Sequence, residues 1–296
     1  MWDWMHKRTN VLQLTGLLCF SLVSSSVQCQ SLLDDLLGPE ELMVRPVSAT
    51  FKDTRIINAQ SNETPGKRVL HFVIAHRFGQ VNDGIYELFG LDNASMRMGF
   101  DYGITDRLCV GVGRSTFQKT IEGSVKWRAL QQNTDNSMPV SVTLYSVMMA
   151  NGLRWADPDR QNYFTSRLSY THQAIIAKKW NESFSLALIP SLTHRNLVAT
   201  LEDAHDQVTM GLGGRYKVGP RASVNFEYHY ALAGLPDESV NSLSLGMDIE
   251  TGGHVFQLHL TNSQGMFERA FLTETSGTWG DGAIYFGFNL SRVFDF

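Results

Sequence analysis

Apolar and polar residues alternate along most of this chain, and the pattern is clearest in residues 282–296. There Ile284, Phe286 and Phe288 are each separated by one residue, and the apolar row extends to the terminal Phe296, interrupted at Arg292. Successive side chains of a β-strand point to opposite faces, so strict alternation predicts a strand with one apolar and one mostly polar face. The chain is therefore expected to end in an amphipathic strand.

The same alternation recurs upstream, from residue 68 onward. Met96, Met98 and Phe100 share one face of a predicted strand, with Arg97 and Asp101 on the other. The whole pattern predicts about 12 strands of roughly 9–13 residues, the length needed to cross a bilayer at a tilt. Polar faces would also suit the surface of a soluble β-sandwich, so alternation alone does not separate the two folds.

The connections between the predicted strands separate them better. Residues 103–105 and 218–220 form tight links, whereas 193–206 and 262–281 are long. Long and shorter links alternate back to residue 68, although 114–120 is shorter than its neighbour 129–139. Membrane barrels have short turns at one end and long loops at the other. The sequence therefore predicts an all-β fold, an antiparallel up-and-down transmembrane β-barrel.

Strand parity decides where residues 47–58 belong. This segment looks extended but alternates poorly, with Lys52, Asp53 and Arg55 on both faces. Counting it would give an odd number of strands, whereas single-chain bacterial barrels are even-numbered. We therefore exclude it from the wall and expect it either to fold into the lumen as a plug or to pack beneath the barrel.

Composition adds mainly exclusions. The chain has 296 residues, 18% of them charged, and a formal net charge of −4, which gives no electrostatic support for nucleic-acid binding. After the N-terminus no apolar run approaches the roughly 20 residues of a membrane-spanning helix. Half-polar strands escape hydropathy scales, so these numbers agree with a transmembrane barrel.

The N-terminus has the pattern of a secretory signal peptide. Lys7 and Arg8 precede the short apolar run 11–23, and small and polar residues follow up to Cys29. Cleavage after Cys29 would leave Cys109 as the one cysteine, so no internal disulfide is expected. We divide the chain into a signal peptide (1–29), a periplasmic or plug segment (30–67) and the barrel (68–296), located in the bacterial outer membrane.

A strand that runs to a terminal Phe resembles the C-terminal recognition strand of bacterial outer-membrane barrels. The resemblance implies outer-membrane lipid and the barrel-assembly machinery as partners. The residues assigned to this assembly signal are Phe288, Leu290, Phe294 and Phe296.

Several longer phrases resemble a known family. They are TFKDTRIIN (50–58), ETPGK (63–67), HRFG (76–79) and LDNASMRMGFDYGITDRLCVGVGRS (91–115). They are similar to a family of bacterial proteins catalogued as domain of unknown function 5777. The resemblance covers most of the mature chain and implies an envelope β-barrel with a signal peptide. It supplies no established activity, so it assigns no catalytic residues.

No motif of an enzyme is evident. HExxH, cysteine–histidine zinc spacing, a phosphate-binding loop and GxSxG are all missing from the sequence. His172 with Ser166 or Ser169 comes nearest to the Ser–His pair that barrel phospholipases carry on the outer wall, and a histidine at the membrane interface or in the lumen is the favoured interpretation. We predict no enzyme activity, no cofactor and no metal site.

The polar faces of the strands carry charges of both signs. On this interpretation they point into a narrow lumen, where they pair with each other or form a constriction that selects small polar solutes. The expected function is thus a passive or gated channel. The alternatives are a structural or anchoring barrel for envelope partners and a barrel enzyme acting on lipid. The lumen-lining candidates are Arg97, Asp101, Arg107, Glu122, Lys126, Arg128, Arg167, Arg215, Lys217, Glu227, His229 and Asp248.

Overall fold

The computed structural model describes residues 44–296, of which 46–296 form one compact unit. The predicted signal peptide and the first part of the predicted plug segment lie outside the described residues. No helix within the described part of the chain is long and apolar enough to span a membrane.

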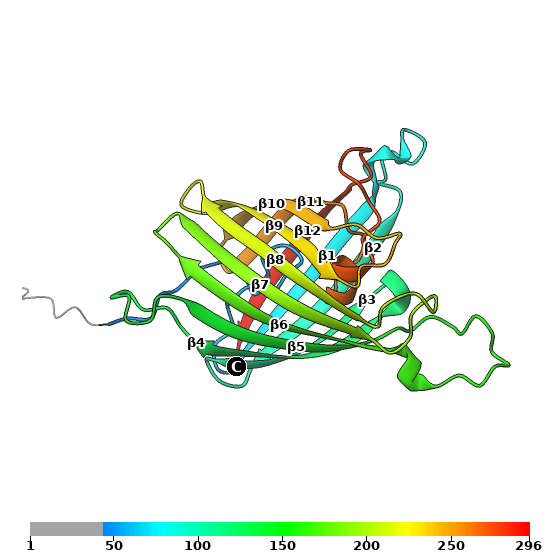
Figure 1. Cartoon of the computed structure of the whole chain (residues 1–296). Helices are drawn as coiled ribbons and strands as arrows, with labels where there is room; N and C mark the ends of the chain where they lie inside the picture. The colour runs from blue at the N-terminus through cyan, green and yellow to red at the C-terminus, as the bar shows by residue number, and fades with distance from the viewer. Residues whose placement is uncertain (1–43) are drawn as a thin grey trace, which may run out of the picture. The chain divides into compact units, whose positions relative to one another are not determined.

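Twelve antiparallel strands form one closed barrel in which each strand pairs with its neighbours in the sequence and β12 pairs with β1 (Figure 1). The predicted 12-stranded up-and-down barrel is thereby confirmed. The strands are β1 (Val69–Gln80), β2 (Ala94–Gly103), β3 (Leu108–Ser115), β4 (Ile121–Leu130), β5 (Ser141–Ala150), β6 (Leu168–Lys179), β7 (Phe184–Arg195), β8 (Asp206–Lys217), β9 (Ala222–Ala233), β10 (Ser242–Thr251), β11 (His254–Thr261) and β12 (Tyr285–Asp295).

The C-terminal strand closes the barrel. Its register with β1 runs from Val69↔Asp295 to Gln80↔Tyr285, with one irregularity after Arg77. Phe288 and Leu290 point outward, while Asn289 between them is buried on the inner face. The alternation that predicted a strand thus also sets which side chains face the lumen. Phe296 follows the strand and is exposed.

The two ends of the barrel differ. We call the end with the links 104–107, 131–140, 180–183, 218–221 and 252–253 the turn end. The opposite end, with the links 81–93, 116–120, 151–167, 196–205, 234–241 and 262–284, is the loop end. The loop end carries three short 3-10 helices and the α-helix α2 (Glu268–Thr273). The link between β3 and β4 remains the short exception that the sequence showed.

Candidate functional site

The lumen is filled by two insertions, and the first is the N-terminal segment. Residues 50–63, here called the plug, lie in the lumen enclosed by the strands, and most of them are buried. The plug contains a tight hairpin, in which Ile56 N–H donates to Ala59 O (2.8 Å) and Ser61 N–H donates to Thr54 O (2.9 Å). Such a hairpin satisfies part of its own backbone and leaves the remaining groups to the wall.

The wall binds the main chain of the plug through one acidic side chain, which accepts hydrogen bonds, and through several basic and neutral side chains, which donate them. The carboxylate of Glu227 on β9 accepts hydrogen bonds from the N–H groups of Ile57, Asn58 and Ala59 at 3.0–3.2 Å. Donors from other strands reach plug carbonyls. These donors are Lys126 (to Thr54 O), Arg128 and Thr143 (both to Asn62 O), Arg215 (to Thr50 O), Gln257 (to Ile56 O) and Asn289 (to Ile57 O).

The second insertion is the loop 262–284, which folds back from the loop end. All six residues of α2 within this loop are buried. The two insertions meet inside the lumen, where Gln60 Nε2 donates to Glu268 Oε1 at 3.1 Å. The barrel is therefore occluded from both ends by chain segments that contact each other.

Arg77 on β1 holds both insertions at once. Its guanidinium donates to Ser263 O (2.6 Å) and Gly265 O (3.0 Å) of the loop and to Asn58 Oδ1 (2.7 Å) of the plug. Arg77 is fully buried, and within the described residues no carboxylate lies within 4.0 Å of it. The flat five-donor fork of arginine suits such a set of acceptors.

One side of the lumen is apolar. On this side the two insertions bury Phe51, Ile56 and Phe271 against the inner faces of β5, β6 and β7. An apolar patch that faced a water-filled lumen would be costly, and the insertions remove that cost by covering it. The inner-wall residues of this patch are Tyr145, Val147, Met149, Ile175, Ala177, Ala187 and Ile189.

Most of the charged residues predicted to line the lumen lie on the inner face of the barrel wall. Their side chains are buried or half-buried against the insertions or against each other. Arg97 and Glu122, on β2 and β4, form an ion pair. Lys217 is half-buried at the turn end of β8. The residues on the inner face are Arg97, Asp101, Glu122, Lys126, Arg128, Arg215, Glu227, His229 and Asp248.

The structure corrects the placement of two predicted lumen residues. Arg107 is exposed in the turn between β2 and β3, because the ladder of these strands ends at Gly103↔Cys109. Arg167 lies in the 3-10 helix η3 (Phe164–Arg167) of a loop, and its guanidinium stacks 3.8 Å over the ring of Trp155. Extending the alternation assigned both residues to strands, although both lie beyond the strand ends. Strand boundaries are the least certain part of such a pattern.

Arg77 is not among the lumen-lining residues predicted from the sequence, and the loop insertion was not predicted. The alternation of β1 did carry a signal for Arg77, because His71, Val73, Ala75 and Arg77 share the face opposite the apolar row. The signal for α2 is the group of apolar residues at helical spacing in a long loop, including Phe267, Phe271 and Leu272.

A polar cavity of about 360 Å³ opens at the turn end, between the plug, β1, β11 and β12. Asp53 and His71 line it, with His71 Nε2 2.6 Å from Asp53 Oδ1. Burial alone would raise the pKa of Asp53, but the neighbouring His71 and hydrogen bonds to the carboxylate outweigh burial and lower the pKa to about 2. Asp53 is therefore an anion that helps to hold the plug.

A second polar cavity, of about 370 Å³, lies at the loop end against the same seam. Gln80, Asp83 and Asn93 line it, together with Gln264 and Tyr285. The cavities at the two ends are separated by the plug and by the loop, which meet at Arg77.

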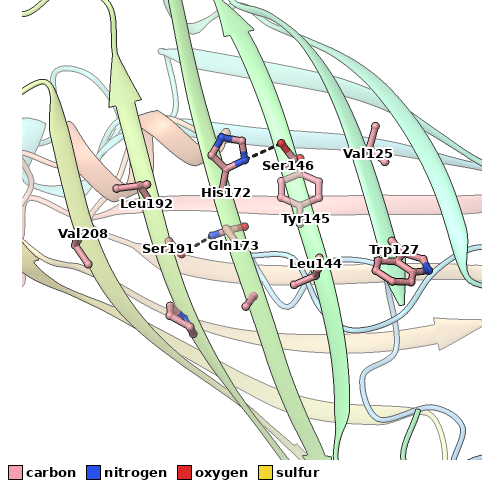
Figure 2. A pocket seen from close by; sticks show the side chains of 12 residues that line it. Val125, Trp127, Leu144, Tyr145, Ser146, His172, Gln173, Ser191, Leu192 and Val208 are labelled. Carbon is pink, nitrogen blue, oxygen red and sulfur yellow. Dashed lines mark hydrogen bonds between the residues drawn. The ribbon is translucent and has the colours of Figure 1, made fainter. Parts of the chain in front are cut away.

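The outer wall carries a separate, apolar groove of about 600 Å³ across β4 to β8 (Figure 2). In this groove Ser146 Oγ and His172 Nδ1, on neighbouring strands, lie 2.8 Å apart. The structure therefore pairs His172 with Ser146. Ser166 lies in a loop and Ser169 is buried on the inner face. Among the described hydrogen bonds His172 makes only this one, so no third residue orients it as a catalytic base requires.

Three solved structures resemble this chain at low identity. The NanC porin matches with 6% identity and a TM-score of 0.47 over 76% of this chain and 98% of its own. An outer-membrane channel from Pseudomonas putida F1 matches with 14% identity and a TM-score of 0.46, over 78% and 97% of the two chains. The KdgM porin matches with 8% identity and a TM-score of 0.44, over 77% and 99%. Similarity at this level does not bear on function.

No curated protein matches the sequence. A family model does: that of the membrane-bound β-barrel domain catalogued as domain of unknown function 5777, over residues 51–294. The match includes the plug as well as all twelve strands, so plug and wall are parts of one domain. The chain belongs to this family of membrane-bound β-barrel domains.

Proposed function

We propose that the protein is a gated channel for small polar solutes in the bacterial outer membrane, closed in the conformation described above. The observation that carries the proposal is the pair of polar cavities at the two ends of the lumen, separated by the plug and the loop where they meet Arg77. Displacing the plug would remove one of the two segments that separate these cavities along β1 and β12.

The plug is the better candidate for the moving part. It is joined to the wall by covalent structure on one side only, through residues 64–68, whereas the loop 262–284 is fixed between β11 and β12. The wall forms hydrogen bonds mainly with main-chain groups of the plug. Water can replace these bonds when the plug leaves the lumen. The bias of the loop lengths supports a periplasmic position for the turn end and for the plug that enters there.

The apolar contacts of the plug favour the closed state. Phe51 and Ile56 are 2% and 1% exposed. Exposing each side chain to water costs about 2 kcal/mol. Spontaneous opening of the wild-type protein is therefore expected to be rare, and opening needs a trigger that acts on the plug.

Two variants test the proposal in planar bilayers. The release variant, Phe51→Asn with Ile56→Asn, removes the apolar anchors of the plug and leaves the wall unchanged. The lock variant, Ile57→Cys with Gly246→Cys, ties the plug to β10, because a Cβ added at Gly246 would lie 3.2 Å from Ile57 Cγ1. We expect long-lived current steps from the release variant and none from the oxidised lock variant.

The variants must first be shown to form barrels, by heat-modifiable migration on unboiled gels. Leu70→Asn with Ile74→Asn, on the outer face of β1, is the matched control that leaves the plug in place. A folded release variant that stays silent at every voltage would overturn the channel and favour a sealed anchoring barrel.

A further inference from the structure

The lumen separates charge across its width. In the closed ring, β4 and β9 are five strands apart in one direction and seven in the other, so they lie on nearly opposite walls. Three inner-face side chains are buried: Lys126 and Arg128 of β4 are 3% and 8% exposed, and Glu227 of β9 is 0% exposed. One wall thus carries two cations and the opposite wall carries an anion.

The plug lies between these groups and complements both. Lys126 Nζ donates to Thr54 O (2.9 Å) and Gln60 Oε1 (3.1 Å), while Glu227 accepts the N–H groups of residues 57–59. The plug therefore presents partly negative oxygens to β4 and partly positive N–H groups to β9. A solute that replaces the plug needs negative groups toward β4 and positive groups toward β9.

Most other charges on the inner face of the wall are paired within the wall, whereas Glu268 of the loop loses its partner Arg55 when the plug leaves. Arg97 is paired with Glu122 on the β2–β4 side. On the β8–β10 side, Ser223 links Arg215 to Asp248 through hydrogen bonds of 3.1 and 3.4 Å. Three further ionisable groups lie on β1 and β2. His71 lies 3.8 Å from Asp101, and Arg77 is held by carbonyl and amide oxygens.

We infer that the open lumen selects zwitterionic solutes, small molecules that carry a carboxylate and an ammonium group, such as amino acids or short peptides. The carboxylate faces Lys126 and Arg128, and the ammonium group faces Glu227. A solute with both charges replaces both sets of plug contacts. An anion, a cation or a neutral amide leaves at least one buried charge without a partner.

This inference rests on the proposed channel, and its test uses the release variant in phosphatidylcholine vesicles. The probes are four radiolabelled solutes of similar size at trace concentration: alanine (zwitterion), lactate (anion), alaninamide (cation) and lactamide (neutral). We expect alanine to enter about fivefold faster than each of the other three, since it alone meets both charged walls.

Single substitutions in the release variant assign the preference to its residues. Glu227→Gln should slow alanine and alaninamide relative to lactate, while Lys126→Met should slow alanine and lactate relative to alaninamide. Lys178→Met is the matched control, because Lys178 lies on β6 over the ring of Trp180 and is not on the inner face. It should change none of the four rates.

The outcomes separate the two proposals. Entry of none of the four solutes through a folded release variant contradicts the channel itself. Equal entry of all four, or an alanine preference that survives both Glu227→Gln and Lys126→Met, leaves the channel standing and overturns the zwitterion selectivity. Opposite shifts in the two substitutions support it.

Discussion

Arg55 of the plug and Glu268 of α2 form an ion pair inside the lumen, with Arg55 Nη1 3.3 Å from Glu268 Oε1. Their side chains are 8% and 0% exposed. Burial alone would lower the pKa of Arg55, but the carboxylate of Glu268, together with other acidic groups nearby, outweighs burial and raises it. The pair joins two segments that enter the barrel from opposite ends, so each segment helps to hold the other.

Removing the carboxylate of this pair should loosen both insertions. We expect Glu268→Ala to destabilise the folded barrel by about 3 kcal/mol, because it leaves Arg55 as a buried charge without its partner. Thermal unfolding in detergent, followed by gel migration, measures the loss. Glu274→Ala, which breaks the more exposed pair with Arg269, is the control and should cost much less. Equal losses would mean that the Arg55–Glu268 pair does not latch the insertions.

Arg77 should control the frequency of opening. Arg77→Lys keeps the charge but loses the fork that reaches Ser263 O, Gly265 O and Asn58 Oδ1 together. We expect opening events about tenfold more frequent than in the wild type, from the loss of one to two charge-assisted hydrogen bonds. Single-channel recording measures this. Arg114→Lys, on the exposed face of β3, should match the wild type. Unchanged opening in Arg77→Lys would remove Arg77 from the gate.

The plug should detach in strong acid. The pKa of Asp53 falls from an ordinary 3.8 to about 2 in the folded protein, so its contribution to plug binding is complete above pH 3.8 and is lost as the pH falls through about 2. A nitroxide on Thr64→Cys, in a background with Cys109→Ser, should become mobile over that window. With Asp53→Asn the label should show no transition there. A transition that persists in Asp53→Asn would assign it to other groups.

The outer Ser146–His172 pair should be dispensable. Ser146→Val with His172→Leu replaces a polar pair on the membrane face by apolar side chains, and we expect a gain of about 1 kcal/mol in unfolding free energy. Urea unfolding in vesicles measures it. The same variant and His172→Ala should show the phospholipid turnover of the wild type. Turnover that is present in the wild type and lost in both would instead support a lipid-acting enzyme.

The orientation in the membrane can be tested on intact cells. Cysteines placed at Asn196 and Asp237 lie in links of the loop end, and one at Gly219 lies in a link of the turn end. We expect an impermeant maleimide to label the first two and not the third. Labelling of Gly219→Cys alone would invert the topology and place the plug outside the cell.

Alternation predicted the wall of this barrel well because one physical constraint acts on every strand. Lipid on one side and a filled polar lumen on the other force side chains such as Phe288 and Asn289 to opposite faces. The same rule failed at Arg107 and Arg167. There the chain leaves the ladder, and local contacts such as the stacking of Arg167 on Trp155 decide the orientation.

The apolar side of the lumen is the main feature that the alternation of apolar and polar residues did not predict. Strands β5, β6 and β7 contain the runs VMMA (147–150), AIIA (174–177) and LALI (186–189), in which both faces are apolar. In a membrane barrel such runs indicate an inner face that something covers. What covers it depends on contacts between distant parts of the chain, such as Phe51 and Phe271 on the same patch, and no local pattern encodes them.

The double occlusion of the lumen also bears on the cell that carries the protein. An outer membrane protects the cell by excluding toxic compounds, and every permanently open pore weakens that protection. A barrel whose lumen is already occluded when it is inserted can be abundant without making the cell sensitive to small antibiotics or dyes. Overproduction of the wild type should then be tolerated on such compounds, whereas the same amount of the release variant should sensitise the cells.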